Sequence, residues 1–493
     1  MLVDQLLKQN RLQPRSPAVS DPVSSLTYRN LTSLAVVMRQ LVLHETRRDT
    51  VGILLPSGGA FAGSFFGTLW AGKVAVPLNF LLSTEELADI VRDAELDLIL
   101  SVHHFDKATS QLPAQTLCLE DLPIKRRVFA ARFRRRPPAP AVQPDDLAVL
   151  LYTSGTSGAP KGVELSFNNL RSNCDAIIEA VRLRDHDRFL CVLPPFHVFG
   201  LTANVLVPVL RGLAVRAIPR FNPAAVFRAI TEFQPTVLMA IPSMYAALLR
   251  NKSADPNTFR GFHLLVSGGE PLPDVVADAF RERFSVDLLE GYGLTETSPV
   301  ISIDLPRDHR RGAVGKPLTN LQLRIVTEEG HIAAANEEGE ILVRGPSVMR
   351  GYHNRPEETA AVLDPDGWFA TGDIGKLDHD GFLHITGRKK EMIIVGGENV
   401  FPQEIENVLS RHPAVEEAAV IGMPDPSRGE VPLAFLTLKG NVSATDIELR
   451  SFAKQHLAGY KVPREIRIVD DLPRGPTGKV AKRKLKERTT AAH

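Results

Sequence analysis

A glycine-rich loop early in the chain has the residue types of a phosphate-binding site. The stretch VLLYTSGTSGAPKGVELS covers residues 149–166 and begins with a short apolar run. Glycines let backbone amides converge on an anion, hydroxyl groups donate to it, and a lysine adds positive charge. The loop is not a P-loop, because Pro160 stands where that motif needs its second glycine. Alone, the stretch predicts either a phosphate site or a surface turn. The candidate residues are Thr153, Ser154, Gly155, Thr156, Ser157, Gly158 and Lys161.

A second stretch, EGYGLTETSP at 290–299, has the residue types of an adenine and metal site. It is not a dinucleotide fingerprint, because Glu296 replaces the third glycine of that motif. An aromatic residue between two glycines suits an adenine stacked on Tyr292. Glu296 would then hold Mg²⁺, a hard cation that prefers carboxylate oxygens beside phosphates. The nucleotide-binding candidates here are Glu290, Gly291, Tyr292, Gly293 and Thr295.

Three later stretches add further candidates. FATGDIG at 369–375 places Asp373 after a glycine in a tight turn, where its carboxylate could accept hydrogen bonds from ribose hydroxyls. ITGRKKEMIIVGGENVFPQEIE at 385–406 and PRGPTGKV at 473–480 complete the series. Any one of them could be a simple turn, but the ordered set predicts a nucleotide site.

The elements that position these motifs follow a strand–helix rhythm. Near-continuous apolar runs alternate with amphipathic segments, a pattern that indicates parallel sheets covered by helices. A helix is expected over 83–94, where Ser83 and Glu86 have the spacing of a capping box. We therefore predict an α/β fold, with a large N-terminal region of parallel-rich sheets and a small mobile α+β C-terminal domain. The expected strands are at 50–56, 73–79, 96–102, 213–219, 236–242, 262–269 and 285–293.

The composition indicates an ordinary globular protein. The 493 residues carry a net charge of +1, which gives no global attraction to nucleic acid or to a membrane. Three widely separated cysteines argue against a disulfide framework or a structural zinc site. Two apolar runs, 50–72 and 189–210, have the length of membrane spans, but prolines and glycines interrupt both. We expect a soluble cytoplasmic protein with no transmembrane segment.

A basic stretch at 124–146 breaks the even distribution of charge. It has seven basic residues between Lys125 and Arg136, followed by four prolines. We expect a solvated linker between two sheet regions. The alternative is a docking patch for an acidic partner or an anionic lipid surface, which would allow peripheral membrane contact.

Taken together, the motifs resemble those of the adenylate-forming superfamily, which includes acyl-CoA synthetases, luciferases and nonribosomal adenylation domains. The resemblance covers essentially the whole chain and keeps the family's motif order. Its motifs here are YTSGTSGAPKG, LPPFHVFG (193–200), SGGEPL (267–272), GYGLTET (291–297), TGD (371–373), GRKKE (387–391) and PTGK (476–479).

The resemblance implies a two-step reaction. A carboxylate attacks the α-phosphorus of ATP to give acyl-AMP and pyrophosphate, and a thiol then displaces AMP. Residues 153–158 and Lys161 would hold the β- and γ-phosphates, while Glu296 and Thr153 would bind Mg²⁺. Lys479 would lie between the substrate carboxylate and the α-phosphate.

The resemblance also assigns the remaining nucleotide and coenzyme A contacts. Asp373 and Arg388 would hold the ribose hydroxyls, and Lys390 would be the hinge between a core at 1–388 and a lid at 389–493. Rotation of the lid would withdraw Lys479 and bring VGGEN (395–399) toward the thiol. The other implied contacts are Gly269, Glu270 and Pro271 at the adenine, with Ile385, Gly396, Gly397 and Glu398.

The residues around His197 bear on which acid is activated. His197 occupies the place of an acyl-pocket histidine, where amino-acid-activating relatives have an aspartate for the α-ammonium group. The neighbouring segments 198–208 and 237–249 are apolar. We predict a medium- or long-chain fatty acid with coenzyme A as acceptor. The alternatives are an aryl acid, acyl carrier protein as acceptor and, more remotely, a non-catalytic nucleotide-binding scaffold.

Overall fold

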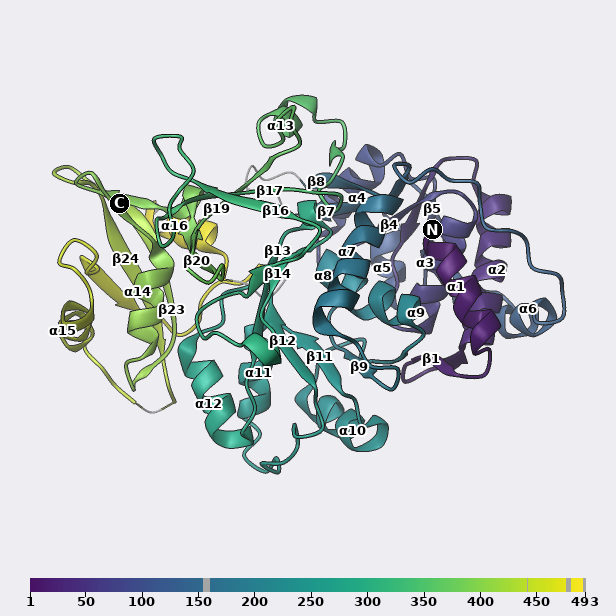
Figure 1. Ribbon diagram of the computed structural model, residues 1–493, viewed down its shortest axis with the longest axis horizontal. Helices are drawn as coiled ribbons and strands as arrows, with labels where there is room; N and C mark the ends of the chain where they lie inside the picture. Colours follow the sequence, from purple (N-terminus) through teal and green to yellow (C-terminus); the bar gives the residue numbers. More distant parts are fainter. Residues whose placement is uncertain (154–159, 441, 476–479, 491–493) are drawn as a thin grey trace.

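Two large sheets form the centre of the N-terminal region in the computed structural model, which describes residues 1–153, 160–440, 442–475 and 480–490 (Figure 1). The first sheet has nine strands in the order β15-β14-β13-β12-β11-β9-β10-β1-β2, and it is parallel from β13 to β1. Its strands are β1 (Pro17–Ser20), β2 (Ser25–Thr27), β9 (Arg188–Cys191), β10 (Ala214–Ala217), β11 (Val237–Ala240), β12 (Leu264–Gly268), β13 (Leu289–Gly293), β14 (Val300–Ile303) and β15 (Lys316–Pro317).

The second large sheet has seven strands in the order β18-β8-β7-β4-β3-β5-β6. It is parallel from β7 to β6, and β8 pairs with β7 in antiparallel register. Its strands are β3 (Thr50–Ile53), β4 (Val74–Pro77), β5 (Leu98–Ser101), β6 (Gln115–Cys118), β7 (Leu147–Thr153), β8 (Lys161–Ser166) and β18 (Gly351–Tyr352).

Helices fill the space between the two sheets and cover their outer faces. Helix α3 contacts β1 of the first sheet and β3 and β4 of the second, so it packs between them. Its Gly67 is needed for close approach, since a Cβ there would lie 2.4 Å from the Cβ of Met38 on α2. The helices of this region are α1 (Leu2–Leu12), α2 (Tyr28–Glu45), α3 (Gly59–Trp70), α4 (Thr84–Asp93), α5 (Asp106–Thr109), α6 (Ile124–Ala131), α7 (Phe167–Val181), α8 (Val198–Leu201), α9 (Val207–Arg211), α10 (Pro223–Phe233), α11 (Pro242–Leu249), α12 (Asp274–Phe284) and α13 (Pro356–Ala360).

The expected strand–helix rhythm is confirmed. The two apolar runs form β3 with α3, and β9 with the short helices that follow it. Helix α4 starts with the predicted capping box, in which the Ser83 hydroxyl accepts from the Glu86 amide and the Glu86 carboxylate accepts from the Ser83 amide. The basic stretch differs from a plain linker, because residues 124–131 form α6. No described helix combines the length and apolar character needed to cross a bilayer.

A four-stranded antiparallel sheet connects the large region to the C-terminal part. Its order is β16-β17-β19-β20, and its strands are β16 (Gln322–Val326), β17 (Gly339–Arg344), β19 (Phe369–Leu377) and β20 (Leu383–Arg388). The chain leaves this sheet after Arg388, passes through a 3-10 turn at Lys389–Glu391, and enters a different sheet at Ile393.

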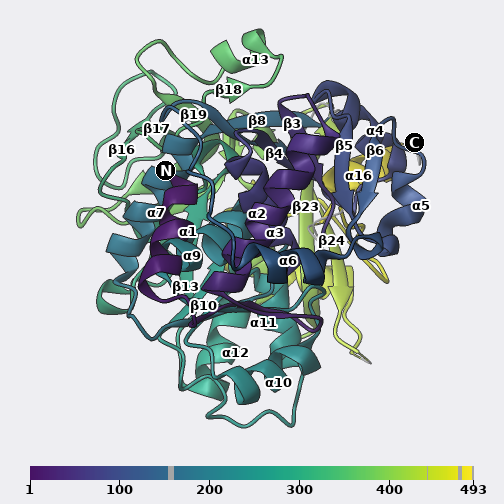
Figure 2. The same ribbon diagram turned by 90° about the vertical axis from the view of Figure 1, so that its right-hand side faces the viewer.

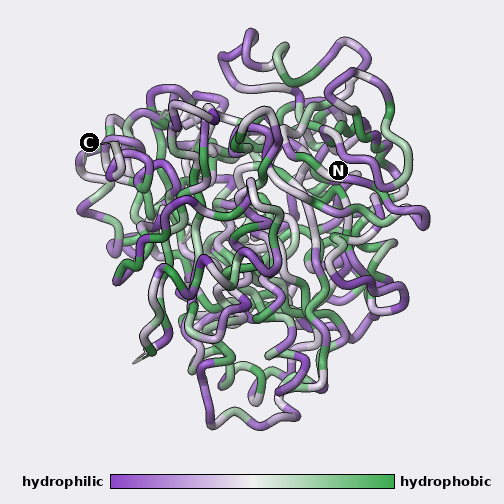
Figure 3. Tube along the Cα trace, turned by 90° about the vertical axis from the view of Figure 1, so that its left-hand side faces the viewer, coloured by the Kyte–Doolittle hydropathy of each residue, from purple (hydrophilic) through white to green (hydrophobic). Residues whose placement is uncertain are grey.

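The C-terminal part has its own sheet and its own hydrophobic cluster (Figure 1, left). Its strands are β21 (Ile393–Val395), β22 (Glu398–Val400), β23 (Val415–Asp425), β24 (Gly429–Leu438) and β25 (Glu465–Ile468), and its helices are α14 (Pro402–Ser410), α15 (Asp446–His456) and α16 (Lys482–Thr490). Many of the outer loops on this side of the molecule are hydrophilic (Figure 3).

Ion pairs at the surface join the C-terminal part to the large region. Arg250 pairs with Glu416 at 3.0 Å, and Arg411 pairs with Asp274 at 2.6 Å. All four side chains are at least one-third exposed, so water reaches both contacts. Exposed pairs of this kind contribute about 0–1 kcal/mol each.

Candidate active site

A cavity of about 890 Å³ brings together many of the residues that the motifs predict. Its lining comes from the ends of β7, β12 and β13, from the start of α8, and from β19 and β20. Segments more than 200 residues apart therefore meet at one place, as the predicted nucleotide site requires. The predicted residues that line it are Thr153, His197, Gly269, Gly291, Tyr292, Gly293, Thr295, Glu296, Asp373, Arg388 and Lys390.

Three of these residues form a group at the cavity wall that is linked by a hydrogen bond and an ion pair. The Tyr292 hydroxyl donates to Asp373 Oδ2 at 2.7 Å, and Arg388 Nε lies 3.0 Å from Asp373 Oδ1. Asp373 is only 3% exposed. Burial raises the pKa of the Asp373 carboxyl, while the positive charge of Arg388 opposes that rise. The group therefore presents a fixed acceptor beside an aromatic ring.

The backbone explains why these side chains meet. Asp373 on β19 and Arg388 on β20 are directly opposite each other in the antiparallel register. Tyr292 lies near the carboxyl end of β13, which is parallel to β12. The next residue must be glycine, since a Cβ at Gly293 would lie 2.0 Å from the carbonyl oxygen of Pro299. The GYG motif thus brings the end of β13 close to the backbone at Pro299.

Glu296 lies in a 3-10 turn at Thr295–Thr297, directly after this motif. The Tyr352 hydroxyl donates to Glu296 Oε1 at 2.8 Å, and the Glu296 carbonyl accepts from the Met349 amide at 2.8 Å. Thr153 lines the same cavity from the end of β7. A carboxylate and a hydroxyl are oxygen ligands of the kind that Mg²⁺ prefers, so the residues present fit that ion.

Lys161 is the first residue of β8 and forms an ion pair with Glu358 on α13. Its Nζ also lies 5.4 Å from the centre of the Tyr352 ring. The predicted phosphate lysine is therefore paired with a carboxylate of this same chain. Five predicted loop residues and the predicted catalytic lysine lie outside the described residues: Ser154, Gly155, Thr156, Ser157, Gly158 and Lys479.

His197 stands at the start of α8, where the chain turns sharply. The His197 amide donates to the Pro194 carbonyl at 3.3 Å. A Cβ at Gly200 would lie 2.1 Å from that carbonyl oxygen, so the turn requires glycine. A π-helical turn at Thr202–Leu206 follows, a feature often found at functional sites. The apolar side chains that line the same cavity as His197 include Val198, Phe199, Ala203, Met239, Ile241, Met244 and Val266.

Several predicted nucleotide or coenzyme A contacts lie elsewhere. Glu290 lines a small separate cavity, where burial raises the pKa of its carboxyl to about 7. Ile385 lines a different cavity, between the four-stranded sheet and the C-terminal part. Gly396 and Gly397 form the turn between β21 and β22 with φ values of +62° and +92°, and the next residue, Glu398, is exposed. Glu270 and Pro271 follow β12 but are not among the residues that line the central cavity.

Two residues of the site were not predicted from the sequence. Tyr352 contacts both Glu296 and Lys161, and Glu358 pairs with Lys161. Neither belongs to a spaced motif. The only signal in the sequence is that GYHNRPEE, at 351–358, is rich in polar and aromatic residues after an apolar strand.

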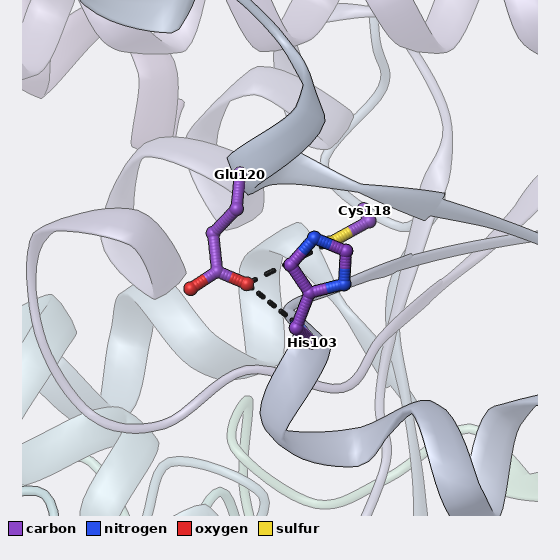
Figure 4. A group of neighbouring side chains, drawn as sticks. All are labelled: His103, Cys118 and Glu120. Atoms are coloured by element: carbon purple, nitrogen blue, oxygen red, sulfur yellow. Dashed lines mark hydrogen bonds between the residues drawn. The ribbon is translucent and has the colours of Figure 1, made fainter.

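Another group of ligand-type side chains lies away from the cavity, at the carboxyl ends of β5 and β6 (Figure 4). His103, Cys118 and Glu120 are close enough to share a metal ion. The two His103 ring nitrogens, however, already lie 2.9 Å from carboxylate oxygens of Asp106 and Asp121. These carboxylates raise the pKa of the imidazole, so the group is best described as an ion-pair cluster around a histidinium.

Comparison with known proteins identifies the family. Residues 6–353 match the AMP-binding enzyme family, and residues 404–479 match the AMP-binding enzyme C-terminal domain. The chain belongs to this family of adenylate-forming enzymes. It is an AMP-forming acid–thiol ligase of the acyl- and aryl-CoA ligase type, and the family binds ATP.

Similar proteins act on different acids. The chain is 34% identical to a long-chain-fatty-acid CoA ligase of Bacillus subtilis (strain 168), over 97% of this chain and 93% of that protein. It is 35% identical to a feruloyl-CoA synthase of an Amycolatopsis species, over 98% of each. The structure of the o-succinylbenzoate coenzyme A synthetase of Bacillus subtilis with ATP and magnesium has a TM-score of 0.85 and 32% identity, over 98% of this chain and 99% of that one. The α/β fold is therefore confirmed, and these names span alkyl and aryl acids.

Proposed function

We propose that the chain activates a medium- or long-chain fatty acid with ATP and transfers the acyl group to coenzyme A. The observation that carries this proposal is the apolar lining of the cavity next to His197. Met239 on β11, Met244 on α11 and Ile241 between these two elements line the same cavity as that histidine. Apolar walls suit an alkyl chain, because burying each methylene contributes about 0.8 kcal/mol.

His197 supports the choice of a simple carboxylic acid. An α-amino acid would bring an ammonium group that needs a carboxylate partner once it is buried. At this position the chain has an imidazole, packed against the Phe196 ring at a centroid distance of 4.7 Å. We assign His197 to the junction between the nucleotide part and the acyl part of the cavity.

In the first half-reaction the residues of this chain bind and orient two substrates. Tyr292 would stack on the adenine, while Asp373 and Arg388 would hold the ribose. Lys161 would leave Glu358 for the departing phosphates. Mg²⁺ held at Glu296 and Thr153 would neutralise charge on those phosphates. Most of the rate enhancement would come from positioning and electrostatic stabilisation.

We further propose that residues 389–493 form a lid that turns about Lys390 between the half-reactions. The chain crosses from one sheet to another at this point, and exposed ion pairs join the two sides. Lys482 on α16 pairs with Glu391 at 2.9 Å, so helix α16 is attached directly beside the proposed hinge. The position proposed for Lys479 precedes this helix by a few residues.

An aryl acid is the second candidate. Five phenylalanines also line the cavity, and two of them, Phe80 and Phe196, form an edge-to-face pair at 4.8 Å. Aromatic walls suit a planar ring in offset or edge-to-face contact. The 35% identity to a feruloyl-CoA synthase adds weight to this candidate.

AMP release over a panel of acids tests the two candidates. The panel runs from acetate through octanoate to palmitate and includes cinnamate and ferulate, each with and without coenzyme A. We expect kcat/KM to rise with alkyl length and turnover to depend on coenzyme A. A preference for the aryl acids would replace the fatty-acid proposal with the second candidate. Acyl-AMP formation without any stimulation by coenzyme A would overturn the proposed acceptor.

A further inference from the structure

A strongly basic surface lies on α6, and none of its residues lines the active-site cavity. We call residues 124–136 the α6 surface, which comprises helix α6 and the five residues after it. No acidic residue occurs between Asp121 and Asp145. Six of the seven basic side chains of the surface are exposed, and the seventh, Arg136, is half-buried. The basic residues are Lys125, Arg126, Arg127, Arg132, Arg134, Arg135 and Arg136.

Two phenylalanines stand in the middle of this positive charge. Phe129 is 60% exposed and Phe133 is 77% exposed. Their ring centroids are 5.3 Å apart, so the rings contact each other. Phenylalanines are usually buried, and a pair of them in water leaves apolar area that a partner can cover.

The opposite face of α6 anchors the helix to the protein. Ile124 and Val128 pack against the main hydrophobic core, and Ala131 is 7% exposed. Helix α6 contacts α2 beneath it. Figure 2 shows α6 near the middle of the face turned to the viewer, in front of α2. The helix is therefore held against the core by its apolar face, and Phe129 points toward solvent from the other face.

The basic side chains of the α6 surface are not paired with acidic side chains of the described residues. None of its seven basic residues forms an ion pair within the part of the chain that the structure describes. Burial lowers the pKa of the Arg136 guanidinium, and the nearby positive charge of Arg29 lowers it further. The chain as a whole has a net charge of only +1. Positive potential is therefore concentrated at this surface.

We propose that the α6 surface binds the face of an anionic phospholipid bilayer. The basic side chains contact lipid phosphates, and Phe129 and Phe133 enter the boundary between headgroups and acyl chains. A bilayer has negatively charged headgroups at its surface and hydrocarbon directly beneath them. This arrangement matches a surface on which basic side chains surround exposed apolar rings. An acidic protein would match the cations but would also need an apolar pocket for both rings. The inference does not depend on which acid the enzyme activates.

Sedimentation with vesicles tests the proposal directly. The full chain is mixed with vesicles of phosphatidylcholine alone, or of phosphatidylcholine with phosphatidylglycerol, and the bound fraction is measured. We expect binding to the anionic vesicles only. Raising the salt from about 0.1 M to about 1 M shortens the Debye length from about 10 Å to about 3 Å and should release most of the protein. Equal binding to both vesicle types, or no binding to either, would overturn the proposal.

Paired variants show whether the α6 surface itself is responsible. Arg126→Gln with Arg127→Gln should weaken partitioning into anionic vesicles by about tenfold or more. Phe129→Ser with Phe133→Ser should have an effect of similar size. The matched controls are Lys252→Gln with Arg260→Gln, which are exposed cations elsewhere, and Ile447→Ser, which is 75% exposed on α15. If the controls weaken binding as much as the α6 variants do, the α6 surface is not the site.

A tryptophan probe distinguishes insertion from simple charge attraction. Phe133→Trp places an indole at the more exposed ring position. Its emission should shift to the blue with anionic vesicles, and lipids brominated on their acyl chains should quench it. Unchanged emission while the protein sediments would contradict insertion of the rings. Binding to an acidic protein such as acyl carrier protein, without binding to vesicles, would instead make the surface a protein-docking site. Unchanged acyl-AMP formation confirms that each variant is folded.

Discussion

The hydroxyl of Tyr292 donates a 2.7 Å hydrogen bond to the carboxylate of Asp373, although the two residues are 81 positions apart in the chain. The bond ties the GYG segment at the end of β13 in the large sheet to β19 of the four-stranded sheet. Arg388 contacts the other oxygen of the same carboxylate. The proposed adenine and ribose contacts are thereby fixed relative to each other before any nucleotide binds.

Removal of the Asp373 carboxylate should weaken ATP binding more than removal of the tyrosine hydroxyl. Hydrogen bonds to charged groups contribute about 1.5–3 kcal/mol, so Asp373→Ala should lower ATP affinity by about 10- to 100-fold. Tyr292→Phe keeps the ring and should cost only a few-fold. Titration calorimetry with ATP measures both effects, and the exposed Asp366→Asn is the control. Wild-type affinity in Asp373→Ala would rule out its ribose role.

Replacement of Glu296 should affect metal use. Glu296→Gln should reduce the rate of pyrophosphate exchange by about 10²-fold and raise the Mg²⁺ concentration needed for half-maximal rate. Tyr352→Phe is the matched control, because it removes the hydrogen bond to Glu296 and leaves the carboxylate in place. An unaltered Mg²⁺ requirement in Glu296→Gln would show that the ion is held elsewhere.

Release of Lys161 from its ion pair should favour phosphate binding. Glu358 is 39% exposed, and exposed pairs contribute about 0.2–1 kcal/mol. Glu358→Gln should therefore tighten pyrophosphate binding by about two- to fivefold at low salt. Glu357→Gln changes the neighbouring carboxylate on the same helix and should leave the affinity unchanged. Weaker binding in Glu358→Gln would mean that the ion pair supports the phosphate site.

The buried carboxyl of Glu290 should make stability depend on pH. Its pKa is about 7 in the folded protein, above its ordinary value of 4.5. Between these values the folded state keeps a proton that the unfolded state releases, so the free energy of unfolding falls as pH rises from about 4.5 to about 7. The loss is about 1–3 kcal/mol.

Glu290→Gln removes this titration. The variant should gain about 1–3 kcal/mol over the wild type at pH 8 and little at pH 5, as measured by urea unfolding. The exposed Glu338→Gln serves as the control. The same difference from wild type at both pH values would contradict a raised pKa at Glu290.

A bulkier side chain on α11 should shorten the acyl cavity. Met244 lines the cavity from α11 and is half-buried, so Met244→Trp fills space with little disturbance to the core. We expect kcat/KM for palmitate to fall by at least about tenfold while that for butyrate is retained. An equal loss for both acids would place Met244 outside the acyl path.

The sequence predicts local features well where the pattern is itself local. Ser83 and Glu86 define the start of α4 from three-residue spacing, and the structure shows both hydrogen bonds. The motif around Tyr292 is likewise contiguous in the chain, at the end of β13, where Gly293 meets a nearby backbone. Such features depend on neighbours in the chain, so spacing and residue type are sufficient to predict them.

Contacts between distant segments were harder to predict. Tyr352 reaches Glu296 across 56 residues, and Glu358 reaches Lys161 across an even longer separation. Neither residue has a spacing that marks it. The basic stretch was expected to be a linker, yet Ile124 and Val128 find a hydrophobic surface and residues 124–131 become helical. These outcomes depend on packing, which the sequence pattern does not show.

The ion pairs Arg250–Glu416 and Arg411–Asp274 should make the enzyme sensitive to the ionic strength of its surroundings. They are few, exposed and weak, so dissolved salt competes with them directly. If the C-terminal part turns between two positions, salt should shift the time it spends in each. We expect the ratio of adenylate formation to thioester formation to change with ionic strength, with catalytic residues and substrates unchanged. The salt concentration would then determine the relative rates of the two chemical steps.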